Sequence, residues 1–249
     1  MPPKIKVIWI LCIIAVVFGF IYYAVLGQVD EARQKSKLKA KQQSRLKEKI
    51  KVRKTEDEGR TFKIDPLKEI KELNALGKYD EAAKYAERVA TLNPNQPKIY
   101  TWWGISLVKQ GNNSEAIKKF KKSSKLDPGY PKTYLYWGLT LAMEGKSEEA
   151  ITNYKKVVEL DPNNSNAYAY WGAALEQLNE HEKAVEKLER ALEIHPSNHN
   201  VFNILIDALF QLERYDEAWK VVKKARQFKV VIPENSLKRL KRVFLEPTG

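Results

Sequence analysis

The chain shows two patterns of hydrophobic and polar positions. Residues 7–26 form an apolar stretch without a charged side chain. From residue 63 onward, apolar side chains instead recur three and four positions apart among charged ones, which is the period of an amphipathic helix. These helical stretches are short and come in pairs, separated by breaks. The second pattern therefore predicts an all-α structure built from helix pairs.

The helix pairs repeat every 34 residues. Four residue types keep this interval: Trp103, Trp137 and Trp171; Gly104, Gly138 and Gly172; Pro94, Pro128, Pro162 and Pro196; and Ala82, Ala116, Ala150, Ala184 and Ala218. A fixed period of this length predicts a solenoid, in which similar helical units stack on one another. The period divides the region into five units: 63–96, 97–130, 131–164, 165–198 and 199–232.

Each unit contains a break between its two helices and a signal that ends it. The breaks are expected at Gly77, Gly111, Gly145, Asn179 and Glu213. The first four units close with a proline, which cannot continue a helix and disfavours the helical conformation of the residue before it. Residues 233–249 then hold a further amphipathic helix, with Leu237, Leu240 and Phe244 on one face. We interpret it as a cap, since the last unit of a solenoid otherwise exposes its stacking face.

The spacing over residues 63–232 resembles that of the tetratricopeptide repeat. In that family an aromatic residue, an apolar–glycine pair, an alanine, a second large side chain and a proline follow in order. The third unit carries them as Tyr134, Trp137-Gly138, Ala150, Tyr154 and Pro162, and the second and fourth units resemble it. The first and fifth units depart from the pattern, as the ends of an array do. The resemblance implies a right-handed α-solenoid of five helix-turn-helix repeats with a C-terminal capping helix.

Two aromatic rows share the 34-residue interval but have different expected roles. The tryptophan row (Trp103, Trp137 and Trp171) is expected in the core, beside the glycines. The groove row (Trp102, Tyr136 and Tyr170) lies one position earlier, at a place that faces the inner, concave surface in tetratricopeptide repeats. The resemblance therefore implies a peptide-binding groove lined by Lys98, Thr101, Trp102, Ile105, Val108, Lys132, Leu135, Tyr136, Leu139, Tyr170 and Ala173.

An aromatic surface of this kind favours an amphipathic helix or an extended apolar peptide as its ligand. The alternative is that these aromatic side chains are covered within the solenoid, by the preceding segment or by the cap. The family branch that binds chaperone tails grips a terminal carboxylate with Lys, Asn and Arg side chains. Thr101, Ile105, Tyr136 and Tyr170 stand at the corresponding places here, which argues against that ligand.

The apolar stretch near the N-terminus predicts a transmembrane anchor. Its twenty residues are enough for a helix to cross ~30 Å of hydrocarbon. Trp9, Tyr22 and Tyr23 lie near its ends, where aromatic side chains favour the membrane interface. A cleaved signal peptide is the alternative, although its apolar core would be shorter and a small-residue cleavage site would follow. We therefore expect an anchor at 1–27, a basic, partly helical stalk at 28–62, the repeats, and the capping segment.

Residues 33–54 of the stalk hold eleven Lys and Arg against one acid, Glu48, a net charge of +10 compared with +13 for the whole chain. Basic residues are more frequent after the anchor than before it, which predicts repeats on the cytoplasmic side of the membrane. We expect a bacterial inner membrane, since no organellar targeting pattern precedes the anchor. The opposite orientation would place the repeats in a periplasm or lumen. Candidate contacts to anionic lipid headgroups are Arg33, Lys35, Lys37, Lys39 and Lys41. A solvated spacer is the alternative. Nucleic-acid binding is disfavoured because the stalk has no aromatic side chains to stack on bases.

Residues suited to catalysis or metal binding are sparse. Cys12 is the single cysteine, and His195 and His199 lie on either side of Pro196 in a turn, so no metal-ligand set is formed. Neither a phosphate-binding loop nor a nucleophile motif occurs. We expect no enzyme activity and no cofactor. The expected function is a membrane-anchored scaffold that recruits protein partners. The alternatives are a self-assembling coat and an accessory subunit of a membrane enzyme or biogenesis machine.

Overall fold

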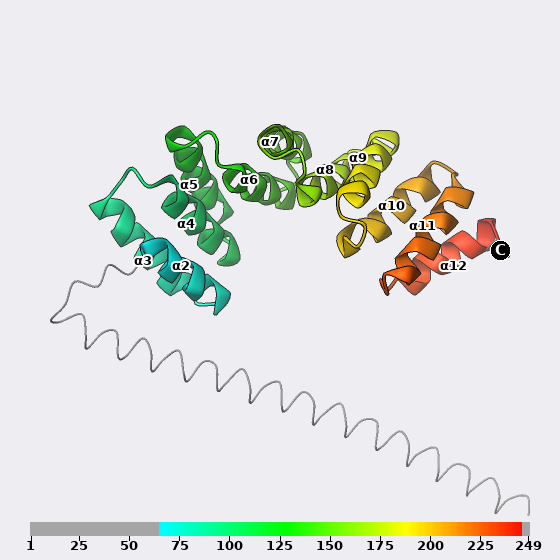
Figure 1. The fold of residues 1–249 in the computed structure, drawn as a ribbon, viewed down its shortest axis with the longest axis horizontal. Helices are drawn as coiled ribbons and strands as arrows, with labels where there is room; N and C mark the ends of the chain where they lie inside the picture. Colours follow the sequence, from blue (N-terminus) through cyan, green and yellow to red (C-terminus); the bar gives the residue numbers. More distant parts are fainter. Residues whose placement is uncertain (1–64, 246–249) are drawn as a thin grey trace, which may run out of the picture. The chain divides into compact units, whose positions relative to one another are not determined.

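The computed structural model describes residues 65–245 of the 249-residue chain, which divides into the units Met1–Lys63 and Ile64–Gly249. The described region holds eleven α-helices and no strand (Figure 1). The prediction of an all-helical repeat solenoid is therefore confirmed for this region. The expected anchor at 7–26, the stalk and its candidate lipid contacts lie outside the described residues. Between residues 65 and 245, the helices are too short or too polar to cross a membrane.

The helices form five hairpins followed by a single helix. They are α2 (Pro66–Ala75) with α3 (Tyr79–Leu92), α4 (Pro97–Lys109) with α5 (Asn113–Leu126), α6 (Pro131–Met143) with α7 (Ser147–Leu160), α8 (Ser165–Gln177) with α9 (His181–Ile194), α10 (His199–Gln211) with α11 (Tyr215–Gln227), and α12 (Glu234–Val243). The second helices of the first four hairpins end two residues before the repeated prolines. This is the termination that a proline imposes.

The turn inside each hairpin contains one residue with a positive φ, at the break that the sequence predicts. The φ angles are +73° at Gly77, +82° at Gly111, +75° at Gly145, +58° at Asn179 and +58° at Glu213. The amide after each of these residues donates to a carbonyl five positions earlier, as from Lys146 to Leu141 at 2.9 Å. This is the hydrogen-bond pattern that closes a helix through a left-handed residue. The breaks predicted at these five positions are confirmed.

Replacing Glu213 with glycine is expected to stabilise the last hairpin. Glu213 is exposed, yet it adopts a left-handed conformation that costs a non-glycine residue roughly 1–2 kcal/mol. Glycine also gains freedom in the unfolded chain, so the expected net gain in the free energy of unfolding is about 0.5–1 kcal/mol. Urea denaturation of the full-length chain measures it. Gly145→Ala is the matched reverse change, because a Cβ added at Gly145 would meet no atom within 4 Å. This substitution should lower the free energy of unfolding through the positive φ alone. A decrease in the free energy of unfolding for Glu213→Gly would contradict the argument.

The first and second helices of the hairpins form two different layers. The first helices contact one another in series, α2 with α4, α4 with α6, α6 with α8 and α8 with α10, whereas the main partners of the second helices are the neighbouring first helices. Closer spacing of the first helices places them on the inner side of the curve. In Figure 1 the hairpins follow an arc, with α6 on its inner side and α7 on its outer side.

Close approach within each of the three central hairpins depends on glycine. A Cβ atom added at Gly104 would lie 2.5 Å from the ring of Phe120, and one at Gly138 would lie 2.6 Å from the ring of Tyr154. At Gly172 the added atom would lie 2.6 Å from Leu188. The three larger side chains are fully buried. Each glycine therefore makes room for a side chain of the second helix, which sets the distance between the two layers.

The tryptophan row departs from the sequence prediction. Trp103, Trp137 and Trp171 pack against the core clusters but are only partly buried, so the expectation that they are core residues is confirmed only in part. Tyr100 stacks on Trp103 with ring centroids 6.2 Å apart, and Lys119 of α5 lies over the same tryptophan. Lysines of the second helices also lie over the other two members of the row. The row therefore lies at the side of the second helices, beneath basic side chains.

Helix α12 covers the end of the last hairpin. Leu240 is fully buried in the same cluster as Trp219 of α11, whose indole Nε1 donates to the carbonyl of Phe244 at 3.1 Å. The ring of Phe244 stacks on Tyr215 with centroids 6.3 Å apart. Arg239 pairs with Asp207 of α10. The side chains of α12 thus bury apolar surface that the fifth hairpin would otherwise expose.

Candidate functional site

The expected groove residues come from three consecutive first helices. Helix α4 carries Lys98, Thr101, Trp102, Ile105 and Val108; α6 carries Lys132, Leu135, Tyr136 and Leu139; and α8 carries Tyr170 and Ala173. These helices contact each other on the inner side of the arc. The structure therefore brings the three helices together, although it does not expose every one of these side chains.

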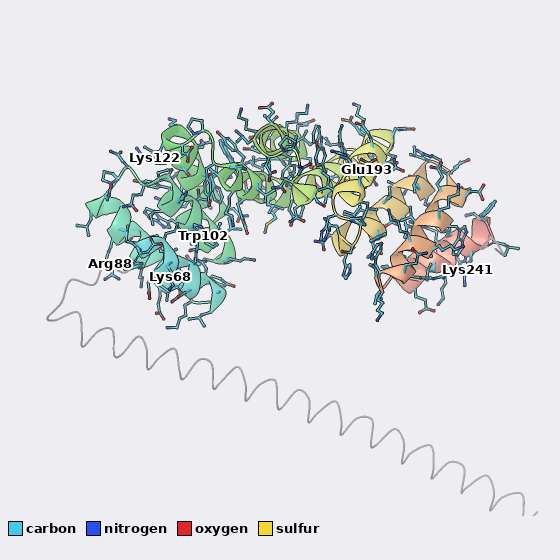
Figure 2. The ribbon with its side chains drawn as sticks, in the orientation of Figure 1. Lys68, Arg88, Trp102, Lys122, Glu193 and Lys241 are labelled. Carbon is cyan, nitrogen blue, oxygen red and sulfur yellow. The ribbon has the colours of Figure 1, made fainter. Side chains whose placement is uncertain are left out.

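Trp102 on α4 (Figure 2) lies among basic side chains of both neighbouring first helices. The Nζ atom of Lys71 on α2 is 5.6 Å from its ring centroid, and that of Lys132 on α6 is 5.0 Å away. Lys132 also lies 5.9 Å from the ring of Tyr136. These distances are those of cation–π contacts. Trp102 and Tyr136 thus share one ammonium group at the inner surface.

Lys71 and Lys132 form a basic pair without a carboxylate partner among residues 65–245. Burial lowers the pKa of the Lys132 ammonium below its usual range, and the positive charge of Lys71 adds to this effect. An anion bound near Lys132 would raise this pKa again, because it would compensate the ammonium for its lost hydration and for the repulsion by Lys71. The surface around Trp102 is therefore suited to a ligand that carries a carboxylate beside an apolar group.

The aromatic surface continues from Tyr136 to Tyr170. Both side chains are half-buried, and burial raises the pKa of the Tyr170 hydroxyl. The ring of Tyr170 also lies against the buried Tyr154, with centroids 6.1 Å apart. Partly buried aliphatic side chains accompany this row: Val108, Leu135, Leu139 and Ala173. The inner surface thus combines rigid rings with apolar side chains, and Met143 at the end of α6 is 67% exposed.

Thr101 and Ile105 require a correction. Thr101 is fully buried, and its hydroxyl lies 2.8 Å from that of Ser123 and 2.7 Å from that of Thr133. It faces the interface of α4 with α5 and α6, because adjacent positions on a helix point about 100° apart. Ile105 is 5% exposed and packs in a core cluster. The prediction that these two side chains face the groove is therefore wrong.

Two residues near Trp102 were not predicted from the sequence. Lys71 belongs to the first unit, which departs from the repeat pattern, but it stands 68 residues before Leu139, a partly buried residue of the inner surface. The repeat frame itself would have placed it on the inner face. Tyr130 precedes α6, and Lys98 lies 5.6 Å from its ring centroid. Burial raises the pKa of the Tyr130 hydroxyl. No sequence signal distinguishes this tyrosine from an ordinary loop residue.

Comparison with known families agrees with the repeat geometry. Residues 67–131 match the family model described as Tetratricopeptide repeat, and residues 143–225 match the model described as Anaphase-promoting complex, cyclosome, subunit 3. The two matches support a tetratricopeptide-repeat family for this chain. No curated protein matches the sequence.

Several solved structures share the fold. A crystal structure of MamA is 24% identical with a TM-score of 0.60, and the match covers 67% of this chain and 95% of that one. MamA from Desulfovibrio magneticus RS-1, residues 41 to the end, is 22% identical with a TM-score of 0.60, covering 66% and 96%. Pseudomonas aeruginosa PilF is 17% identical with a TM-score of 0.66, covering 73% and 83%. This fold is typical of protein-interaction scaffolds.

Proposed function

We propose that this protein is a membrane-anchored scaffold that captures a protein partner on the inner surface of its repeats. Trp102, Tyr136 and Tyr170 are the proposed anchors, because large rings at a partly exposed, apolar surface provide binding energy at low entropic cost. The ligand is an amphipathic helix or an extended apolar peptide. The observation that carries the proposal is the half-buried groove row flanked by Lys71 and Lys132.

The charges of this surface narrow the chemistry of the partner. Lys71 and Lys132 converge on Trp102 with no carboxylate paired to either within the described region. A partner segment with an acidic side chain next to an apolar one would place its ring or alkyl group on Trp102 and its carboxylate between the lysines. Because partly exposed ion pairs are screened by salt, binding should weaken as ionic strength rises.

The N-terminal part of the chain completes the proposal. Residues 7–26 would hold the scaffold in a bacterial inner membrane, and Arg33, Lys35, Lys37, Lys39 and Lys41 would contact anionic headgroups. The excess of basic residues after the apolar stretch supports a cytoplasmic position for the repeats. Protease treatment of sealed vesicles checks this orientation: repeats that stay protected in inside-out vesicles would contradict it.

Replacing Trp102 and Tyr136 together by alanine is expected to reduce partner capture at least about tenfold, since each removes a ring from the binding surface. Crosslinking and recovery of the full-length protein from native membranes, followed by mass spectrometry of the captured proteins, measures this loss. Both rings are only half-buried, so helicity by circular dichroism should be retained.

Tyr168→Ala is the matched control. Tyr168 is also a partly buried aromatic residue on a first helix, but it stacks on Trp171 of the tryptophan row with centroids 6.4 Å apart. Its removal should leave capture unchanged. Equal capture by the wild-type chain and the Trp102/Tyr136 double variant would contradict the assignment of the inner surface as the binding site.

A further inference from the structure

The side of the repeats that carries the tryptophan row contains a recurring lysine–tryptophan contact. In the second unit, Lys119 Nζ lies 3.8 Å from the ring centroid of Trp103 and 2.8 Å from a carboxylate oxygen of Glu115. In the fourth unit, Lys187 Nζ lies 4.6 Å from the centroid of Trp171. Each of these two lysine side chains is only 19% exposed. An ammonium over tryptophan is thus a packed feature of both units.

The third unit keeps the tryptophan and the acid but lacks the lysine. Asn153 stands 34 residues after Lys119 and 34 before Lys187, while Trp137 and Glu149 are the counterparts of Trp103 and Glu115. The short side chain of Asn153 turns back onto its own helix, where its Nδ2 donates to the carbonyl of Glu149 at 2.9 Å. The place that an ammonium occupies in the second unit is therefore open in the third.

A cavity of about 560 Å³ lies at this place, between α6 and α7. It is lined by Tyr134, Trp137, Leu141, Glu149, Thr152, Asn153, Lys155, Lys156 and Glu159. The equivalent cavity of the fourth unit is smaller, about 340 Å³, and has Lys187 rather than a tryptophan in its wall. Trp171 borders a separate cavity together with Lys155 and Lys187, and both of these lysines lie over its ring.

Among the charged groups around Trp137, the carboxylate of Glu149 has no ion-pair partner in the described region. Lys156 pairs with Glu159 at 2.9 Å, and Lys155 lies 5.6 Å from the centroid of Trp171. Lys121 of α5 reaches only to 5.9 Å from the centroid of Trp137. Glu149 is exposed and has no basic group within ion-pair distance between positions 65 and 245. Pairing with Glu144 at 3.0 Å raises the pKa of Lys146, and the charge of Glu149 adds to this effect. The indole Nε1 of Trp137 also has no hydrogen-bond partner in this part of the chain.

We propose that this cavity, the Trp137 socket, is a second binding site that takes a lysine side chain from a protein partner. The inserted ammonium lies over the ring of Trp137 and pairs with Glu149, as Lys119 does with Trp103 and Glu115 within the chain. Tyr134 and Leu141 cover the alkyl part of the inserted side chain. The socket lies apart from the groove row, so the inference does not depend on the proposed function of the inner surface.

The test uses the full-length chain labelled with 5-fluorotryptophan, whose six signals are followed by ¹⁹F NMR. The probe is a blocked pentapeptide with one central lysine between glycine and serine residues. Its addition should shift the Trp137 signal, assigned with Trp137→Phe, in a saturable manner. The same peptide with an acetylated lysine should cause no shift, because acetylation removes the charge that both Trp137 and Glu149 recognise.

Two variants decide the outcome. Asn153→Lys places a lysine of the chain itself in the socket and should abolish the shift, while Asn153→Gln, which remains neutral, should preserve it. Glu149→Gln changes an exposed side chain and should weaken binding by about two- to fivefold, the range of an exposed ion pair; it tests the proposal even if Asn153→Lys misfolds. An equal response to the acetylated peptide, a shift unaffected by Glu149→Gln, or no shift of the Trp137 signal would overturn the proposal.

Discussion

Replacing Leu240 by alanine is expected to lower the free energy of unfolding of the C-terminal hairpin by about 2–5 kcal/mol, the range for large buried aliphatic side chains. Leu240 is the one fully buried residue of α12, and it holds this helix against the last hairpin. Its truncation leaves a cavity and frees the helix that covers α10 and α11. In a solenoid each unit contacts only its neighbours, so the loss should be local.

Hydrogen exchange of the full-length protein measures this local effect. Amides of α10 and α11 should exchange faster in Leu240→Ala, while those of α4 to α7 should keep their protection. Val243→Ala is the control on the same helix, because Val243 is 50% exposed and should contribute little. Unchanged protection of α11 in Leu240→Ala would show that α12 does not stabilise the end of the array.

Gly138→Ala is the second substitution with a large expected effect. The new Cβ would lie 2.6 Å from the ring of Tyr154, which is only 1% exposed and cannot move aside without displacing its neighbours. Overpacking of this kind costs about 1–3 kcal/mol, more than the ~1 kcal/mol that alanine gains over glycine within a helix. We therefore expect a net decrease in the free energy of unfolding, measured by urea denaturation followed by circular dichroism.

Gly129→Ala is the matched control for this change. Gly129 lies in the turn before α6, and a Cβ there would meet its nearest neighbour, an oxygen of Asp127, at 3.4 Å. Without a clash, the loss of conformational freedom in the unfolded chain should make this substitution neutral or slightly stabilising. If Gly138→Ala were equally harmless, the spacing of α6 and α7 would not depend on the absence of a side chain at position 138.

The two proposed sites use the two layers of the repeats differently. The groove row is flanked by lysines of neighbouring first helices, whereas Trp103 and Trp171 of the tryptophan row are covered by lysines of their own second helices. A scaffold with both sites could hold an acidic, apolar segment on its inner surface and a lysine at the Trp137 socket. The two experiments are independent, because the Trp102/Tyr136 variant leaves the socket intact and Asn153→Lys leaves the groove row intact.

The sequence by itself determined the features that depend on local interactions along the chain. The 34-residue period placed the helix pairs. The turns followed from three glycines and from Asn179 and Glu213 at the same repeat position, because a left-handed residue closes a helix through hydrogen bonds to its own last turn. The repeat pattern also located Gly138 and Tyr154, but their close approach is a finding of the structure. The resemblance to tetratricopeptide repeats assigned the groove row to the inner surface, and adjacent helix positions face different directions, so the tryptophan row was expected elsewhere.

Only the tertiary structure decided which of these side chains reach the surface. Thr101 is one position from Trp102, yet it is buried in a hydroxyl cluster because α5 and α6 close over it. The exposure of a side chain depends on the helices packed against it from both neighbouring units, and periodicity along one helix does not contain that information. For the same reason, the partly exposed tryptophan row, the lysines over it and the open place beside Asn153 became visible only when the two layers were brought together.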